Sequence, residues 1–419
     1  MRSSFLVFIA LLCPLATHAA EQPLTLDAAV NLALSRAPQV AAGQAATESA
    51  QSLSVSAGRL PDPQAIIGID NLPVTGTDAF STTRDFMTMR KAGLMQSFPA
   101  GAQRRSERAV AGAEITLADA QLQATQYEVA RNAAVAWVRY AAANDSLERL
   151  SALESDLEFG ARAATAALRS GRANASEALA ADAGVTQLKS RLIQLRGELR
   201  RDESELARWI GRDSMSRPAP IPSMDDLPAE VERLRASVHQ HVSLRPLDAE
   251  VEVAQAKLEL ARAARRPGWS AEVSYAKRGP DFSDMASLQF TVDLPLFARN
   301  RQNPVIAARG ADVRRAQAER EAELRMHQAE FEQMLATWES TGEQLKYIEA
   351  ERLPLAHERS SAALAAYRGN QGDMRAALDA FEDETDLLLE RANLQIERGM
   401  AWSYLRYLDI ADAALRNQP

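Results

Sequence analysis

The most constraining feature of this chain is that its second half repeats the order of landmarks found in its first half. Trp137 is followed by a turn-forming stretch at 168–171, and about 200 residues later Trp338 is followed by a similar stretch at 367–370. Each half reads as a helix, a β hairpin, a very long helix, a tight turn and a shorter returning helix. A self-similar period of this length indicates a duplicated structural unit.

The duplication divides the chain into two structural repeats, residues 21–211 and 229–419, which a connector at 212–228 joins. This connector is expected to be extended because prolines recur in it. These are Pro218, Pro220, Pro222 and Pro228.

Residues 1–20 predict a secretory signal peptide. Arg2 supplies the basic start of this segment, and residues 5–12 form its apolar stretch. Residues 17–20 resemble a small-residue cleavage site, so the mature chain should begin near Glu21. The apolar stretch is too short to cross a bilayer. No later run approaches the roughly 20 apolar residues of a transmembrane helix. We therefore expect an exported chain without a helical membrane anchor.

Cysteine content and charge exclude several classes of protein. Cys13, the sole cysteine, lies inside the predicted signal peptide. It is either an acylation site or, as the flanking Leu12 and Pro14 favour, a small apolar residue of the signal. The mature chain then lacks thiols for disulfides, thiolate metal sites or catalysis. The formal net charge of −8 argues against a nucleic-acid partner.

Very long helices are predicted at 103–169 and 304–367, where good helix formers dominate. Pro304 suits a first helical turn, whereas Pro354 should kink or break the second helix. Helices of this length extend on the order of 100 Å, so they must bury their apolar stripes against one another, as in a coiled coil. Shorter helices are predicted at 26–58, 175–210, 229–266 and 374–413.

Two β hairpins are predicted between the helices, at 64–98 and 269–297. In the second hairpin, apolar and polar residues alternate with a period of two. Its candidates for a lipid-facing surface are Trp269, Val273, Tyr275, Leu288, Phe290 and Val292. In the first hairpin, strands are expected at 64–71 and 86–98, and Arg90-Lys91 leaves the facing of the latter open.

These strands have the length and the two unlike faces of transmembrane β-strands, although a soluble hairpin resting on a helix shows the same pattern. Export of the chain favours the membrane. Four strands cannot close a barrel, because about eight are needed, and open sheet edges are not tolerated in lipid. If the strands span a membrane, several chains must share one barrel, and three chains with twelve strands are the natural solution. The outer loops and the far helical tips would then be 71–85, 278–284, 168–175 and 367–374.

Several stretches carry a resemblance to a known family. They are Leu24-Thr25-Leu26-Asp27-Ala28-Ala29-Val30; Gly58-Arg59-Leu60-Pro61-Asp62-Pro63 with Asn71-Leu72-Pro73-Val74; Met87-Thr88-Met89 with Met95-Gln96-Ser97-Phe98-Pro99; and Leu294-Pro295-Leu296-Phe297-Ala298-Arg299-Asn300-Arg301-Gln302. Together they resemble the TolC-like outer-membrane factors, in particular the heavy-metal efflux branch related to cobalt–zinc–cadmium and copper–silver channels. The resemblance covers essentially the mature chain.

This resemblance implies a mixed, mainly α fold. Long α-helical hairpins would form a periplasmic tunnel, and four transmembrane β-strands per chain would close as a 12-stranded barrel in a homotrimer. It also implies two further partners, a periplasmic adaptor (membrane fusion) protein and an inner-membrane proton-driven efflux pump. The expected function is a passive exit duct in the outer membrane for heavy-metal cations.

The resemblance also assigns candidate residues at the tips. Arg169, Gly171 and Leu179 match the tip pattern that adaptors contact. At the second tip, Arg368 is followed directly by Gly369, where the family usually has one intervening residue. At equivalent positions in the two turns, Gly171 and Asn370 are residue types that accept the left-handed conformation of a tight turn.

Leu378-Asp379-Ala380 resembles the segment that places an acidic ring at the tunnel constriction. We expect Asp379 from three chains to form a cation-selective ring, since carboxylate rings select cations in pores. The alternative is an ordinary solvated helix acid, like Glu382 and Asp383.

Other patterns admit a metal site but favour plainer interpretations. His239 and His241 are two residues apart, a spacing that does not place them on one helix face, so a helix-end role is favoured over zinc or copper binding. Met87, Met89 and Met95 are interpreted as apolar strand residues and not as copper(I) ligands. Trp269 fits either an interfacial aromatic belt or a packed strand end. No metal site or cofactor is expected.

The sequence lacks the glycine-rich phosphate loops and catalytic signatures of common enzymes, so no enzymatic activity is expected. Two alternatives stay open. The first is an outer-membrane channel for drugs, organic compounds or type I-secreted polypeptides. The second is a periplasmic coiled-coil scaffold or an adaptor, although the lipoyl-like β domain expected of an adaptor is not evident.

Overall fold

The computed structural model describes residues 23–369 and 371–408. The predicted signal peptide with Cys13, the turn residue Asn370 and the end of the last predicted helix therefore lie outside the described residues.

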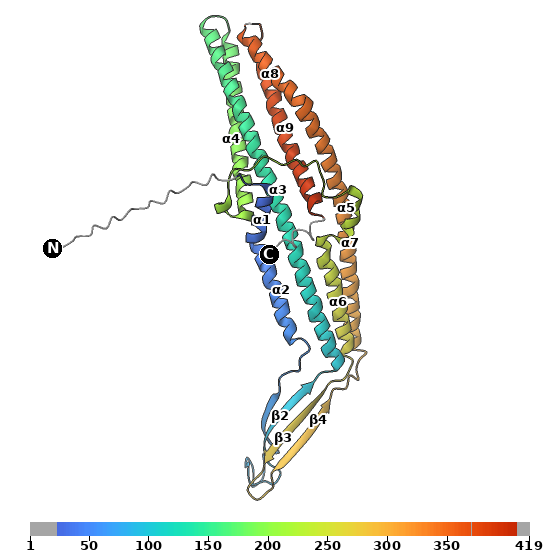
Figure 1. Cartoon of the computed structure of the whole chain (residues 1–419). Coiled ribbons are helices and arrows are strands. Elements are labelled where there is room, and N and C mark those ends of the chain that lie inside the picture. The colour runs from blue at the N-terminus through green and yellow to red at the C-terminus, as the bar shows by residue number, and fades with distance from the viewer. Residues whose placement is uncertain (1–22, 370, 409–419) are drawn as a thin grey trace, which may run out of the picture. The chain divides into compact units, whose positions relative to one another are not determined.

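The elements follow the same order in both halves (Figure 1). The first half contains α1 (Leu26–Arg36), α2 (Pro38–Ser56), β1 (Gln64–Asp70), β2 (Met89–Phe98), α3 (Gly101–Arg169) and α4 (Ala175–Ile210), and the connector begins with the short 3₁₀ helix η1 (Arg212–Ser214). The second half contains α5 (Val231–Ser237), η2 (Val238–Gln240), η3 (Val242–Leu244), α6 (Arg245–Ala263), β3 (Trp269–Lys277), β4 (Met285–Val292), α7 (Gln302–Tyr347), η4 (Ile348–Arg352), α8 (Leu353–Arg368) and α9 (Met374–Tyr407).

The long helices form where they were predicted. α3 runs through 69 residues without a break, as a stretch dominated by strong helix formers should. Its counterpart is divided into α7 and α8 by η4, a five-residue π-helical segment that ends two residues before Pro354. Proline lacks a backbone N–H and its ring crowds the preceding turn. The helix therefore forms a wider π-helical turn just before it.

Two helices predicted as continuous are broken. The helix expected at 26–58 is interrupted at Ala37, which is extended (φ −63°, ψ 123°) because the residue before Pro38 avoids the α region. The helix expected at 229–266 is interrupted at His241, which is also extended (φ −56°, ψ 141°). The prediction of single helices was wrong in both places.

The four strands form one antiparallel sheet in the order β1-β2-β3-β4. β2 and β3 pair from Phe98↔Trp269 to Arg90↔Lys277, which joins the hairpins of the two halves. β2 begins at Met89 and not at the predicted residue 86, because the Asp85 carboxylate holds the preceding backbone in a turn. Among the described helices, none is both long and apolar enough to cross a membrane.

The described residues form two compact units, each drawn from both halves. One comprises 23–36, 132–225 and 339–400, and the other 37–131, 226–338 and 401–408. The first unit is built around a leucine-rich cluster from α3, α4, α8 and α9, whose members include Leu150, Leu192, Leu364, Phe381 and Leu388. The second contains a cluster from α5, α7 and α9, including Leu234, Phe331, Leu335, Tyr404 and Leu405. The first cluster therefore combines helices of both repeats, whereas the second consists of helices of the second repeat.

Candidate functional site

The sheet has one exposed apolar face. The register places Leu94, Val273 and Leu288 side by side on neighbouring strands, and their side chains are about 60% exposed, at 63%, 61% and 63%. The six residues predicted to face lipid all lie on this face: Trp269, Val273, Tyr275, Leu288, Phe290 and Val292. Since nothing in the described chain covers them, the face is suited to an apolar environment.

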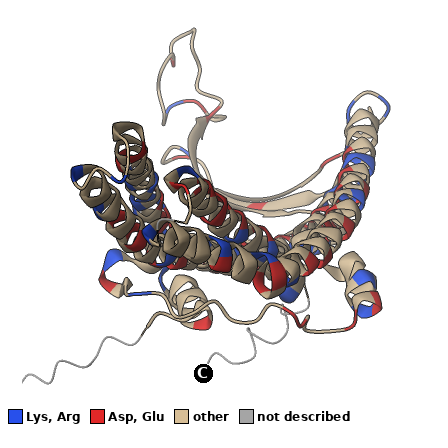
Figure 2. Cartoon of the chain, turned by 90° about the horizontal axis from the view of Figure 1, so that it is seen from above, with Lys and Arg blue, Asp and Glu red and all other residues tan. Residues whose placement is uncertain are grey.

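The opposite face of the sheet carries mostly polar or small residues, together with Ile66, Met89 and Met95. Lys91 and Glu272 form an ion pair on it, and Gly93 lies against Ser274. The register therefore settles the facing of the strand that the sequence left open. Even-numbered residues of β2 share the face of Leu94, and Arg90 lies near the end of that face, whereas Lys91 lies on the opposite face. Figure 2 shows the strands largely tan, with the charged residues concentrated on the helices.

The three methionines do not form one site. Met87 precedes β2, so the prediction that it shares a strand with the other two was wrong. Met89 and Met95 lie at opposite ends of the strand's paired segment. No group of three or more acidic, histidine or cysteine side chains that could hold a metal ion occurs among the residues that the structure describes.

The turn between α3 and α4 is held by local chemistry. Gly171 has φ +72°, the left-handed conformation predicted for a tight turn. Asn174 caps α4 by accepting a hydrogen bond from the Glu177 amide at 2.9 Å, and its own amide donates to the Glu177 carboxylate at 2.8 Å. Arg169 and Leu179 are exposed beside this turn, where a partner could contact them.

The second tip has a different geometry. Gly369 ends α8 with φ −76°, so it does not adopt the left-handed conformation of Gly171. The Arg368 guanidinium lies 4.2 Å from the ring centroid of Phe159 on α3, a cation–π contact between the two helical hairpins. Of the two adaptor-contact candidates at this tip, Arg368 is therefore already engaged within the chain.

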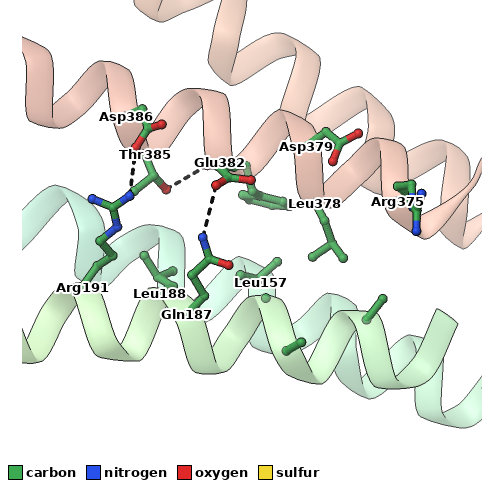
Figure 3. Close-up of a pocket in the computed structure, with 14 residues that line it drawn as sticks. Leu157, Gln187, Leu188, Arg191, Arg375, Leu378, Asp379, Glu382, Thr385 and Asp386 are labelled. Atoms are coloured by element: carbon green, nitrogen blue, oxygen red, sulfur yellow. Dashed lines mark hydrogen bonds and ion pairs between the residues drawn. The ribbon is translucent and has the colours of Figure 1, made fainter. Parts of the chain in front are cut away.

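A groove of about 280 Å³ lies between α4 and α9 (Figure 3). The helices approach closely there, because a Cβ added to Gly184 would lie 2.6 Å from Leu378 Cδ2. Gln187 on α4 donates to Glu382 on α9 at 3.1 Å, and Arg191 lies 3.5 Å from Asp386. The groove is thus bridged by two polar contacts, both shown in Figure 3.

Asp379 lines this groove on α9. Its spacing to Glu382 and Asp386, three and seven residues further on, places the three acids on one helix face. Glu382 and Asp386 contact α4, whereas Asp379 is exposed and has no hydrogen bond or ion pair to another described residue. The structure therefore leaves the Asp379 carboxylate available to solvent or to a cation.

A buried carboxylate that the sequence did not single out lies nearby. Glu384 is 5% exposed, accepts a hydrogen bond from Ser360, and lies 2.9 Å from His357 Nδ1. The spacing of His357 and Ser360, three residues apart on α8, is the only sequence signal for this contact. It fastens α8 to α9.

A second missed group is Arg391, whose side chain is 11% exposed. Its guanidinium contacts Asp145 on α3 at 2.7 Å and Glu349 on η4 at 2.8 Å. Burial by itself would raise the pKa of Asp145, but hydrogen bonds from Arg149 and Arg391 outweigh it and hold the pKa below its ordinary value. This network joins the helical hairpins of the two repeats.

The two neighbouring histidines have separate roles. His239 is exposed and lies 3.4 Å from Gln328. His241 is 1% exposed, and its Nδ1 accepts a hydrogen bond from the Ser243 amide, which caps η3. His241 therefore lies at a helix end, as predicted, because it follows η2 and precedes η3. Burial is the main cause that lowers the pKa of His241 to about 3, and the guanidiniums of Arg131 and Arg245 lower it further.

The fold resembles those of known outer-membrane proteins. Neither a protein-family model nor a curated protein sequence matches the chain. Solved structures do match. VceC, an outer membrane protein of Vibrio cholerae, has 17% identity and a TM-score of 0.76 over 91% of this chain and 95% of VceC. The CmeC outer membrane channel of Campylobacter jejuni has 13% identity and a TM-score of 0.79 over 91% and 85%.

CusC, whose structures describe folding and transmembrane channel formation, matches with 16% identity and a TM-score of 0.76 over 91% of this chain and 90% of CusC. The mixed, mainly α fold predicted from the sequence is confirmed by this likeness.

Proposed function

We propose that this protein is the outer-membrane exit channel of a tripartite efflux system. The observation that carries the proposal is the sheet, which has one exposed apolar face and one polar face on four paired strands. A sheet of this kind is stable in a bilayer only if its edges are paired. The likeness to CmeC and VceC supports the same conclusion.

Three copies complete the proposed channel. β1 and β4 are the edges of the four-stranded sheet, so pairing β4 of one copy with β1 of the next would close a barrel of twelve strands. The polar face would then line the pore. The helical hairpins would form a periplasmic tunnel, whose tips at 168–175 and 367–374 dock an adaptor connected to an inner-membrane proton-driven pump.

A pair of adjacent substitutions tests the membrane assignment. Leu288→Arg places a charge on the apolar face, which costs roughly 2–4 kcal/mol near the middle of a bilayer, and we expect little of this variant in the outer membrane. Gln289→Arg adds the same charge to the polar face and should assemble normally. The measurement is the fraction of protein that stays in washed envelopes and needs detergent for release. Release of the unmodified protein without detergent would instead identify a periplasmic scaffold.

The proposed cargo is a heavy-metal cation. It follows from the resemblance of the sequence to the metal-efflux branch, and the acidic face of α9 with Asp379, Glu382 and Asp386 is compatible with cation passage. A strain lacking this protein should become sensitive to one or more of zinc, cobalt, cadmium, copper and silver. Sensitivity to dyes and other organic compounds alone would assign the channel to organic cargo.

Asp379 is the proposed gate residue. Asp379→Ala should lower the preference for cations over anions in single-channel recordings several-fold, roughly as expected for losing one carboxylate ring, and should weaken block by multivalent cations. Asp383→Ala is the matched control, because this neighbouring acid is ion-paired with Arg359 and does not line the groove. If the Asp379 variant and the unmodified channel have equal ion selectivity, the assignment of Asp379 as the gate residue is contradicted.

A further inference from the structure

A polar cavity lies where the sheet meets the helices of the same compact unit. Its volume is about 560 Å³, and it is lined by the end of β2, the starts of α3, β3 and α7, and the loops that follow α6 and β4. The backbone closes one side, since the Asp293 amide donates to the Gly268 carbonyl at 3.0 Å. The groove between α4 and α9 described above belongs to the other unit.

Two cations in this cavity have no partner within the described chain. The side chains of Arg266 and Arg301 make no hydrogen bond or ion pair there, and both are exposed. Elsewhere on α7, arginines are paired along the helix, as Arg315 is with Glu319 and Arg325 with Glu321. Unpaired guanidiniums that converge on a hollow are the usual recognition elements for a phosphate group.

The same cavity holds acceptors that lack a donor. The Asp293 carboxylate makes no ion pair with another described residue, and Gln302 Oε1 is buried without a hydrogen-bond partner. A buried acceptor of this kind is normally satisfied by a donor from ordered water or from a bound molecule. The lining therefore offers two cations for an anion and two acceptors for a nearby cation or N–H donor.

Apolar surface surrounds the cavity. Trp269 stacks on Phe98 with ring centroids 4.2 Å apart, and Leu294, Leu296 and Phe297 are exposed in the loop after β4 at 67%, 75% and 72%. Exposed apolar loops flanked by arginines are typical of the boundary between hydrocarbon and water. A ligand for this site must therefore have a charged head and apolar tails.

We propose that this cavity binds the headgroup of a zwitterionic phospholipid with a primary amine. The guanidiniums of Arg266 and Arg301 bind the phosphate, Asp293 and Gln302 Oε1 accept hydrogen bonds from the ammonium, and the exposed loop contacts the acyl chains. The proposal rests on the proposed function, because it takes the apolar sheet face to lie in a bilayer. It adds a specific lipid partner at the helix-side boundary of that bilayer.

The test uses the full-length protein in detergent and short-chain lipids of defined headgroup. Saturable binding of dihexanoyl phosphatidylethanolamine, measured by native mass spectrometry and by the rise in melting temperature, should be about tenfold or more tighter than that of the phosphatidylcholine and phosphatidylglycerol analogues, which lack the ammonium donor. Inorganic phosphate serves as the probe for simple anion binding. Equal binding of all three lipids, or of phosphate alone, would contradict the proposal.

Variants assign the contacts. Arg266→Gln with Arg301→Gln should weaken binding of all three lipids about tenfold or more, whereas Asp293→Asn should remove only the preference for the amine. Arg314→Gln, on α7 outside the cavity, is the matched control. Unchanged lipid binding by the double variant would refute the site. The site would also be refuted if the unmodified protein binds no lipid because a second copy of the chain covers the cavity.

Conductance of the same preparations in planar bilayers separates the two proposals. A protein that conducts but shows no headgroup preference leaves the channel intact and overturns the lipid site. A protein that neither inserts nor conducts overturns the proposed function itself.

Discussion

Acidification from pH 7 to pH 5 is expected to lower the free energy of unfolding by about 2 kcal/mol through His241 alone. In the folded protein the pKa of His241 is lowered from 6.5 to about 3, chiefly by burial. The unfolded chain binds a proton near pH 6.5, but the folded chain does not. The stabilisation is therefore complete above the unfolded pKa and is lost progressively as the pH falls towards the folded pKa.

The surroundings of His241 explain why it stays neutral. Its ring packs edge-on against Tyr127 on α3, with centroids 4.7 Å apart, and lies 5.0 Å from the ring of His327 on α7. The ring of Tyr404 on α9 is stacked with the ring of His241, and their centroids are 6.5 Å apart. The charged side chains that face this cluster are Arg131, Arg245, Glu323 and Glu330. A proton on His241 would thus be desolvated and close to two guanidiniums.

His241→Phe keeps an aromatic ring but cannot titrate. This variant loses the cap on the Ser243 amide at every pH, so a constant loss of stability is expected together with a flatter dependence on pH. His239→Gln is the control, because the exposed His239 lies two residues away. Denaturant unfolding of the detergent-solubilised protein at pH 7, 6 and 5 measures the slope. Parallel curves for the unmodified protein and His241→Phe would contradict the linkage.

The long helices were predictable because their sequence pattern is local. α3 has good helix formers over its central part, and Pro354 predicted the interruption of the second long helix that η4 forms. Pro38 carried the same kind of signal, but the predicted helix at 26–58 ran through it. The restriction that a proline places on the preceding residue decides the structure at Ala37.

The sheet was predictable in part. Alternation along β3 and β4 identified one apolar set of residues before any register was known. The pairing of β2 with β3 joins residues such as Leu94 and Val273 that are far apart in the sequence, and no local pattern encodes it. Only this register shows that Lys91 lies on the polar face, opposite to Leu94.

Buried charges were not predictable from the sequence. Glu384 and Arg391 occur among many exposed acids and arginines on α9, and nothing in their spacing distinguishes them. Their burial depends on which helices pack together, which is a long-range property. His241 is similar, because its place in a core follows from the break between α5 and α6.

Arg391→Met is expected to cost roughly 3 kcal/mol of unfolding free energy, the lower end of the range for breaking a buried ion pair. The substitution leaves Asp145 and Glu349 without their shared cation, while the methionine fills much of the same space. The lower end applies because the two carboxylates are 33% and 49% exposed and keep part of their hydration. Because α3, η4 and α9 meet at this guanidinium, its loss should also loosen the contact between the helical hairpins.

Arg352→Met is the matched control. Arg352 makes two hydrogen bonds to Glu390 on the same pair of helical segments, but both side chains are 43% exposed, so we expect a loss of about 1 kcal/mol or less. The difference between the two variants in lost unfolding free energy should become smaller at acid pH. The Asp145 pKa is lowered in the folded state, so its stabilisation is present above the unfolded pKa and is lost as the pH falls through the folded value. Equal losses in the two variants at pH 7 would show that Arg391 acts as an ordinary surface cation.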